Sequence, residues 1–207
     1  ASHTKVDIRK RFPTIYRTCR EYGINITRDP IPVVPAAHYC CGGVLADVWG
    51  RTSLAGLYVA GEAACTGLHG ANRLASTSLL EGLVWGTRAA RDVSARFEDS
   101  RPYKPADIHQ WYYPRKEEEV DPALVNQDWL TIRSTMWNYA GIIRTRKRLE
   151  RAKSDLEYLR HRVERFYQEA RMDAKVVGLR HGIQVALMIT HAALANPVSL
   201  GAHFRKD

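Results

Sequence analysis

Apolar residues recur at every third or fourth position along a continuous stretch in the second half of the chain. This spacing brings side chains to one face of an α-helix, so the pattern predicts a helix with one buried face. The charged residues between them would then face water. The apolar series consists of Leu149, Ala152, Leu156, Leu159, Val163, Phe166 and Ala170.

Two further helices are predicted on either side of this one. Asp121-Pro122 is typical of a helix start, because proline at the first helical position leaves no amide hydrogen unpaired. Another apolar series runs from Ala174 to Ala195 and stops at Asn196-Pro197. Three helices with short links predict a small bundle. The apolar residues expected along the first helix are Leu124, Trp129, Ile132, Met136 and Trp137.

The first thirty residues predict a helix followed by a turn. Apolar residues between Ile8 and Cys19 keep helical spacing, and Pro13 suits the first turn of a helix. Gly23 is typical of the residue that follows a helix end. The stretch Ile24–Thr27 alternates apolar and polar side chains, which predicts a short strand.

Glycines divide residues 33–62 into short apolar runs, which is a pattern of short strands and turns. We expect one strand over residues 42–47, a turn at Gly50 and a buried strand over residues 56–62. These elements would form the β part of the fold.

A helix is predicted directly after this β part. Ser78 and Glu81 have the S-x-x-E spacing of a capping box, in which the two side chains satisfy amide groups at the helix start. The helix should therefore begin at Ser78 and end near Val93. The apolar residues expected to face the core are Leu79, Leu80, Leu83, Val84 and Ala90.

A polar segment separates the mixed region from the helical one. It contains three prolines and the aromatic run Trp111–Tyr113. We therefore expect a first domain over residues 1–98, a linker over 99–121 and a helical bundle over 122–207. The predicted fold class is α+β.

The chain has 207 residues and a formal net charge of +9. Such a charge favours either a surface that binds nucleic acid or an acidic partner, or a solvated helix face. Acidic residues are interleaved with the basic ones between Arg144 and Glu164, which favours the solvated face. The 45% of hydrophobic residues argues against disorder. No apolar run approaches the ~18 residues of a membrane span, and no secretory signal pattern is seen.

The cysteine pattern gives no sign of a disulfide framework. The cysteines Cys19, Cys40, Cys41 and Cys65 form no Cys-x-x-Cys pair, and adjacent cysteines have a poor geometry for a mutual disulfide. We expect four reduced thiols in a cytosol-like compartment.

Residues 32–82 carry the side chains best suited to chemistry. The helix predicted from Ser78 would present amide groups and a positive dipole end to an anion. Arg73 lies just before it, and a planar guanidinium can bind a carboxylate at two points. His38 and His69 complete the set. Each residue alone also has a structural interpretation, as an ion-pair partner or a hydrogen-bonded histidine; together they predict an anion-binding pocket.

Five motifs are more specific than any single residue. They are Arg28–Tyr39, Cys41–Val44, Gly56–Glu62, Thr66–Ser76 and Met136–Thr145. Together they resemble the L-aspartate oxidase family and, more broadly, the succinate dehydrogenase/fumarate reductase flavoprotein superfamily. The resemblance covers nearly the whole chain. It implies the C-terminal part of an FAD-binding α/β domain followed by a three-helix bundle, with FAD as the cofactor and a dicarboxylate amino acid as the substrate.

The resemblance also implies roles for five residues. His38 and Arg73 match positions that hold a carboxylate of the substrate, and Glu62 matches the acid that binds the FAD ribose hydroxyls. Ser78 and Leu79 match residues beside the flavin ring. In that family a hydride passes from Cα of L-aspartate to flavin N5, which gives iminoaspartate, and oxygen or fumarate reoxidises the flavin. The resemblance implies no metal, nucleic acid or membrane partner.

Part of the family's site has no counterpart in this sequence. No Gly-x-Gly-x-x-Gly unit follows a strand, and the family places that unit and a capping domain with an active-site arginine before this region. We expect the chain to be a C-terminal portion whose partner is the N-terminal FAD-binding and capping portion. Alone it should bind little or no FAD and show no turnover. The expected location is a bacterial cytoplasm or a plant plastid, in NAD biosynthesis through quinolinate.

Three departures from the family's pattern stand out. Cys40 and Thr77 replace the usual threonine and asparagine, and Asn196–Ser199 replaces a charged lead-in to the ending Leu200–Phe204. Two alternative functions remain open: a succinate/fumarate flavoprotein subunit, and a non-catalytic basic helical module that binds nucleic acid or an acidic partner.

Overall fold

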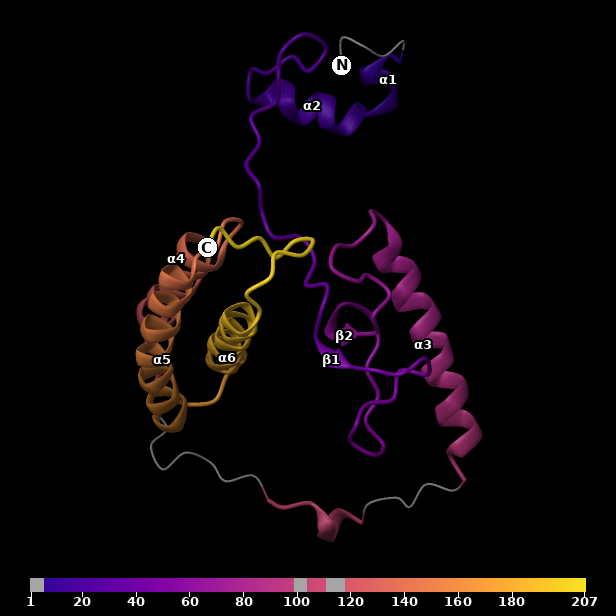
Figure 1. The fold of residues 1–207 in the computed structure, drawn as a ribbon, viewed down its shortest axis with the longest axis vertical. Helices are drawn as coiled ribbons and strands as arrows, with labels where there is room; N and C mark the ends of the chain where they lie inside the picture. The colour runs from indigo at the N-terminus through magenta and orange to yellow at the C-terminus, as the bar shows by residue number, and fades with distance from the viewer. Residues whose placement is uncertain (1–5, 99–103, 111–117) are drawn as a thin grey trace. The chain divides into compact units, whose positions relative to one another are not determined.

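The computed structural model describes residues 6–98, 104–110 and 118–207. These form two compact units, Ala1–Cys40 and Cys41–Asp207, and each is described by itself. The first holds two short helices; the second holds a small sheet, one long helix and a group of three helices (Figure 1).

In the first unit, a short helix α1 (Ile8–Arg11) is followed by α2 (Pro13–Glu21). Proline occupies the first turn of α2 and Gly23 lies just past its end, which confirms the predicted helix and its stop. The strand expected over Ile24–Thr27 is wrong, because this segment forms turns. The side chain of Asn25 accepts hydrogen bonds from the amide and the hydroxyl of Thr27, so local polar bonds replace a strand ladder.

The three predicted helices of the second half are confirmed as α4 (Pro122–Ala140), α5 (Arg146–Glu169) and α6 (Ala174–Ala195). They lie side by side and pack against one another (Figure 1). Asp121 and Asp173 cap α4 and α6 by accepting amide hydrogen bonds. The buried core residues they share are Val125, Ile132, Leu156, Leu159, Val163, Leu179, Ile183, Ala186 and Leu187.

Close packing in the bundle leaves little spare space between α4 and α6. A Cβ atom at Gly182 would lie 2.4 Å from Cη2 of Trp129, so the indole ring occupies the space that a side chain would need. Leu124 and Trp137, which were expected to line the inner face of α4, are instead more than half exposed. The buried face of α4 is therefore narrower than the pattern predicted.

Charges on the outer face of the bundle alternate in sign. Arg151 pairs with Asp155 at 3.0 Å and Lys153 lies 3.9 Å from Glu157, each one helical turn apart. These pairs confirm the prediction of a solvated, mixed-sign face on α5. No helix in the described part of the chain is both long and apolar enough to cross a membrane.

The β part of the second unit is smaller than predicted. Strand β1 (Val44–Leu45) pairs in parallel with β2 (Ala64–Cys65). The expected turn at Gly50 is present. The buried strand expected over residues 56–62 is wrong: Gly61 has a φ of +75°, and the chain turns there into a 3₁₀ helix, η1 (Gly61–Ala63).

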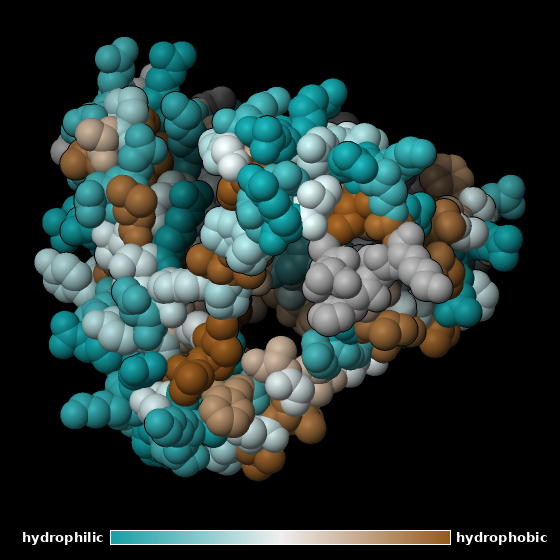
Figure 2. Space-filling model, turned by 90° about the horizontal axis from the view of Figure 1, so that it is seen from above, coloured by the Kyte–Doolittle hydropathy of each residue, from teal (hydrophilic) through white to brown (hydrophobic). Residues whose placement is uncertain are grey.

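The long helix α3 (Thr77–Arg96) differs from its prediction in two ways. It begins one residue earlier than expected, after Ser76 in a left-handed conformation, and Ser78 is not its cap. Its apolar side chains also do not face inward, since Leu79 is 81% exposed. The residues that α3 buries are instead Glu81 and Asp92. Figure 2 shows apolar side chains reaching the surface between hydrophilic ones.

Asp92 joins α3 to the turn that precedes η1. Its carboxylate accepts hydrogen bonds from the Arg51 guanidinium and, at 2.7 Å, from the Tyr58 hydroxyl. These donors hold the pKa of Asp92 well below its usual value, and the carboxylate in turn raises the pKa of Tyr58. Arg51 and Tyr58 form an antiparallel bridge, so they are direct neighbours and both side chains can reach Asp92.

Only part of the expected linker over residues 99–121 belongs to the described residues. A 3₁₀ helix, η2 (Pro105–Asp107), lies within it. The aromatic run Trp111–Tyr113 falls outside the described residues. The division into domains at this segment stays a prediction.

Candidate active site

A loop of residues 66–76, here called the site loop, connects β2 to α3 and is fixed by a buried carboxylate. Glu81 is 1% exposed and lies in the second turn of α3. Its two oxygens bind Thr66 Oγ1 at 2.5 Å and His69 Nε2 at 2.7 Å. Both contacts are short and one side chain of the helix makes them both, so Glu81 holds the first half of the loop against α3.

This arrangement gives Glu81 and His69 different roles from those predicted. Glu81 was expected to complete a capping box with Ser78, but its carboxylate points to the loop instead. His69 was a candidate for binding an anion, and it lies against a carboxylate with only 6% of its side chain exposed. Its structural interpretation is therefore the one that the geometry supports.

Arg73 lies in the site loop, and its side chain reaches the first turn of α3. Its Nη1 donates to the Leu74 carbonyl at 3.2 Å and lies 3.5 Å from Ser78 Oγ. The residue is partly exposed. The structure thus brings together Arg73 and Ser78, two of the residues predicted to form the site.

The first turn of α3 presents backbone amides beside this guanidinium. Ser76 is the residue before the helix, and its side chain makes no capping hydrogen bond. The first amides of a helix carry partial positive charge and favour an anion or a carbonyl oxygen. The predicted positive helix end is therefore present, although it is built without the predicted cap.

Glu62 is carried by η1, next to α3. Gly61 Cα lies close to Gly82: a Cβ on either glycine would be 3.9 Å from the other residue's Cα. With no side chains between them, η1 packs directly on α3 through its backbone. This contact places the exposed Glu62 beside the helix that carries Ser78 and Leu79.

His38 lies in the other compact unit, in an extended segment without helix or strand, and is exposed. Arg73 belongs to the unit Cys41–Asp207. The convergence of His38 and Arg73 on one substrate therefore stays a prediction.

A contact of the C-terminal residues with the site loop was missed by sequence reasoning. The amide of Ala202 donates to the carbonyl of Ala71 at 3.0 Å. Gly201 lies so close that a Cβ there would be 2.2 Å from the same carbonyl oxygen. The only signal in the sequence is a glycine within the family-like ending Leu200–Phe204, and nothing in its spacing identifies the partner.

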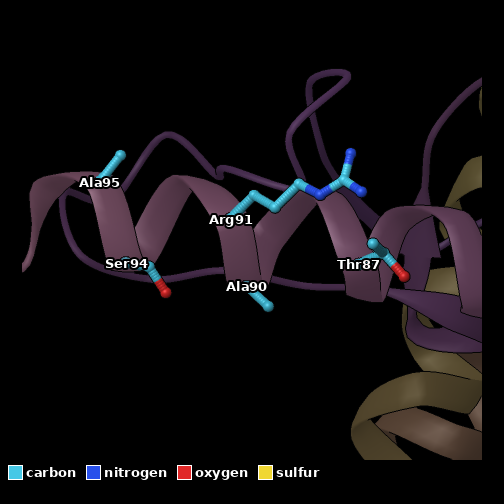
Figure 3. A pocket seen from close by; sticks show the side chains of 5 residues that line it. All are labelled: Thr87, Ala90, Arg91, Ser94 and Ala95. Carbon is cyan, nitrogen blue, oxygen red and sulfur yellow. The ribbon is translucent and has the colours of Figure 1, made fainter.

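Two other features of the described residues do not compete with this site. A shallow hollow further along α3 is lined by Thr87, Ala90, Arg91, Ser94 and Ala95 (Figure 3). All five side chains come from this one helix, so no second element converges on a ligand there. Among the described residues, no group of three or more His, Cys, Asp or Glu side chains could hold a metal ion.

Two family models match the chain. Residues 1–79 match the FAD binding domain, and residues 130–207 match the C-terminal region of the fumarate reductase flavoprotein. Over both stretches the chain is similar to flavoproteins of the succinate dehydrogenase/fumarate reductase superfamily. The first match contains His38, Glu62, Arg73 and Ser78, and the second contains most of the bundle.

Among the curated relatives of the chain are L-aspartate oxidases. The chain is 46% identical over 200 residues to L-aspartate oxidase 1 of Ralstonia nicotianae, which covers 97% of this chain and 37% of that protein. It is 43% identical over 200 residues to L-aspartate oxidase of Acinetobacter baylyi, covering 97% of this chain and 36% of that protein. The chain thus spans little more than a third of the length of these relatives.

Solved structures agree with the superfamily at the level of the fold. A variant of E. coli quinol fumarate reductase superposes with a TM-score of 0.81 at 28% identity, covering 98% of this chain and 37% of that chain. These matches confirm the predicted fold class and the resemblance to flavoproteins.

The residues of this chain fit the FAD that the matching family model implies. The Glu62 carboxylate on η1 can accept hydrogen bonds from ribose hydroxyls. The first amides of α3, which no side chain caps, can donate to the carbonyl oxygens of a flavin ring. The backbone-only approach of Gly61 to Gly82 keeps these two groups near each other. Glu62, Ser78 and Leu79 therefore remain the residues of this chain proposed to hold FAD.

Proposed function

We propose that this chain contributes the cofactor and substrate site of an L-aspartate oxidase, which oxidises L-aspartate to iminoaspartate with FAD. One observation carries the proposal: Nη1 of Arg73 lies 3.5 Å from Oγ of Ser78 in the first turn of α3, whose N-terminus has no side-chain cap, within a segment that matches an FAD-binding domain. The Arg73 guanidinium, which can bind a substrate carboxylate, is thus next to the backbone amides of the first turn of α3, which can bind a carbonyl oxygen of the flavin.

The chain's own residues would bind and orient the two reactants. Arg73 would hold one carboxylate of the substrate by two parallel hydrogen bonds, assisted by His38. The amides of the α3 first turn, at Ser78 and Leu79, would stabilise negative charge on the flavin ring. Glu62 would accept hydrogen bonds from the ribose. FAD, when bound, would supply the redox chemistry by taking up two electrons from the substrate.

The proposed reaction requires more than these 207 residues. The relatives are longer than this chain, and the resemblance places the dinucleotide-binding unit and an active-site arginine in the preceding portion of the protein. We propose that this N-terminal portion is the chain's partner in forming the site. A cytoplasmic location in a bacterium, or a plastid location in a plant, belongs to the same proposal.

Kinetic assays of the full-length protein test the proposal. The protein is assayed on L-aspartate and on succinate separately, with oxygen and with fumarate as acceptors. We expect turnover of L-aspartate. Robust succinate oxidation without L-aspartate turnover would overturn the assignment and support the second candidate, a succinate/fumarate flavoprotein. That candidate is supported by the fold shared with quinol fumarate reductase.

Substitution of Arg73 tests the residue that carries the proposal. Arg73→Ala should raise KM for L-aspartate and lower kcat/KM, since the loss of a charge-assisted pair with the substrate carboxylate costs about 2–5 kcal/mol. Arg91→Ala is the matched control, because Arg91 is an exposed arginine of α3 outside the site. Unchanged kinetics in the Arg73 variant would remove Arg73 from the substrate site.

The isolated chain provides a further check. We expect the 207 residues alone to bind little FAD and to show no turnover. A preparation of this chain alone that binds FAD and turns over L-aspartate would contradict the proposed need for an N-terminal portion.

A further inference from the structure

The C-terminal tail, residues 200–207, is anchored to the bundle by a buried arginine. Arg205 is 8% exposed, and its Nη1 donates to the carbonyl of Ala193 in the last turn of α6 at 3.0 Å. Its Nε and Nη2 pair with Asp207 at 2.8 and 3.1 Å. A buried guanidinium with partners on several sides fixes the chain that carries it.

A second anchor fixes the middle of the tail. Arg144, in the connection between α4 and α5, donates from Nη1 to His203 Nδ1 at 2.7 Å. Since a guanidinium can only donate, Nδ1 accepts, and the other ring nitrogen carries the hydrogen that binds the Asn196 carbonyl at 2.9 Å. Backbone hydrogen bonds of 3.0 and 2.9 Å also join Arg144 to Phe204 and Lys206.

Gly201 and Ala202, here called the tip of the tail, pack closely against the site loop. The Ala202 amide donates to the Ala71 carbonyl at 3.0 Å. A Cβ on Gly201 would lie 2.2 Å from that oxygen and 2.7 Å from Ala71 Cβ, and Gly201 has a φ of +57°. Only glycine fits here, so the tip abuts the loop backbone directly.

The site loop is held at two places before Arg73. Glu81 holds its first half at Thr66 and His69, and the tail meets the loop at Ala71. Arg73 follows two residues after Ala71, in the part of the loop that leads into α3. We propose that the C-terminal tail positions Arg73 for substrate binding, by bracing the site loop through the contact of Gly201 and Ala202 with Ala71.

This inference rests on the proposed role of Arg73 in substrate binding. Two-point recognition of a carboxylate depends on where the guanidinium lies, and a displacement of about 1 Å can cost a hundredfold in rate. The tail touches no substrate in this proposal; Gly201 and Ala202 are positioning residues. The helical bundle would thereby act on the site through its last residues.

The first experiment measures L-aspartate kinetics in the full-length protein. Gly201→Ala should raise KM for L-aspartate by about tenfold to a hundredfold, because its Cβ displaces Ala71. Gly56→Ala is the matched control: Gly56 also has a positive φ, +80°, but nothing lies within 4 Å of its added Cβ. The control therefore carries the backbone strain without the displacement, and its KM should stay near that of the parent.

A double variant distinguishes positioning from a general loss of structure. If the tail acts through Arg73, Gly201→Ala should raise KM in the parent and have no added effect in an Arg73→Ala background. Additive effects of the two substitutions would overturn the proposal. His203→Ala loosens the same tail without adding an atom, and it should reproduce the rise in KM if Gly201→Ala fails to fold.

Amide hydrogen exchange separates this inference from the proposed function. Gly201→Ala should speed exchange across residues 70–76 while leaving α5 unchanged, and Gly56→Ala should not. Suppose that exchange and KM both stay unchanged in Gly201→Ala while Arg73→Ala raises KM. The proposal that the tail positions Arg73 is then refuted, and the proposed function is still supported. If exchange rises but Arg73→Ala leaves KM unchanged, the proposed function fails and the positioning of Arg73 for this substrate fails with it, although the loop contact persists.

Discussion

The helical bundle and the segment of residues 41–98 bury opposite kinds of side chain. In the bundle, Leu149, Leu156 and Leu179 are fully buried. In the other segment, α3 buries two carboxylates, Glu81 and Asp92, and exposes its leucines. The bundle is therefore stabilised mainly by the removal of apolar surface from water. Hydrogen bonds between polar side chains instead hold together residues 41–98, here called the site segment.

This difference suits the two regions to different tasks. Apolar burial is not directional, so it stabilises a bundle without fixing any one side chain to a narrow position. Hydrogen bonds to a buried carboxylate have defined directions and lengths, and they fix the atoms that make them. Such bonds hold the loop that carries Arg73, where position matters more than total stability.

The largest effect should follow from removing an apolar side chain inside the bundle. Leu156 is fully buried, and Leu156→Ala should lower the free energy of unfolding by about 2–5 kcal/mol through lost burial and a residual cavity. Urea unfolding of the 207-residue chain measures this loss. Tyr158→Ala is the control on the same helix, because Tyr158 is exposed. Equal losses in the two variants would contradict apolar burial as the basis of bundle stability.

A smaller but more local effect should follow from replacing Glu81. Glu81→Gln puts an amide nitrogen where one carboxylate oxygen binds Thr66 or His69, at a cost of about 1–3 kcal/mol. Amide exchange should rise in residues 66–76 and stay unchanged in α5. Glu98→Gln, an exposed position just past α3, provides the control. A uniform rise over both regions would show that Glu81 does not act on the loop alone.

The acid sensitivity of the site segment should depend on Asp92. Its pKa is lowered in the folded state by Arg51 and Tyr58, while the unfolded state has the usual value of about 3.9. Below about pH 4 the unfolded chain therefore takes up the proton first, so this contribution to stability is present at neutral pH and lost on acidification. Unfolding midpoints at pH 7 and pH 3 should differ less in Asp92→Asn than in the parent. An identical difference would rule out Asp92 as a source of the acid response.

The smallest effect should come from an apolar residue of α3. Leu83 is 68% exposed, so Leu83→Ala should change the free energy of unfolding of the 207-residue chain by no more than about 0.5 kcal/mol. The same leucine-to-alanine change at Leu156 is the internal reference. A loss from Leu83→Ala that approaches the loss from Leu156→Ala would remove the contrast between the two regions.

Sequence patterns predicted the bundle far better than the site segment. A series such as Leu149, Leu156 and Val163 reports burial directly, because helix periodicity repeats and each helix packs along its length. The ends of α4 and α6 were also predictable, since Asp121 and Asn196-Pro197 act through local chemistry. Periodicity failed only where a wide apolar stripe included exposed residues such as Trp137.

The site segment was harder to predict because its decisive contacts join residues distant in sequence. Ser78 and Glu81 have the spacing of a capping box, but Glu81 binds Thr66 and His69, which lie 15 and 12 residues away. The contact between Ala202 and Ala71 spans most of the chain and has no repeating signal. Residue chemistry and the resemblance to a family both identified Arg73 as a candidate, and only the structure shows what surrounds it.

The packing of Trp129 against Gly182 gives two glycines of α6 opposite value for protein engineering. Replacing glycine by alanine within a helix commonly stabilises it by about 1 kcal/mol. At Gly178 nothing lies within 4 Å of the added methyl group, so the gain should be realised. Four residues later the indole ring blocks the same change, and the methyl group would force two helices apart. A thermostabilised version of this protein should therefore replace the first glycine and keep the second.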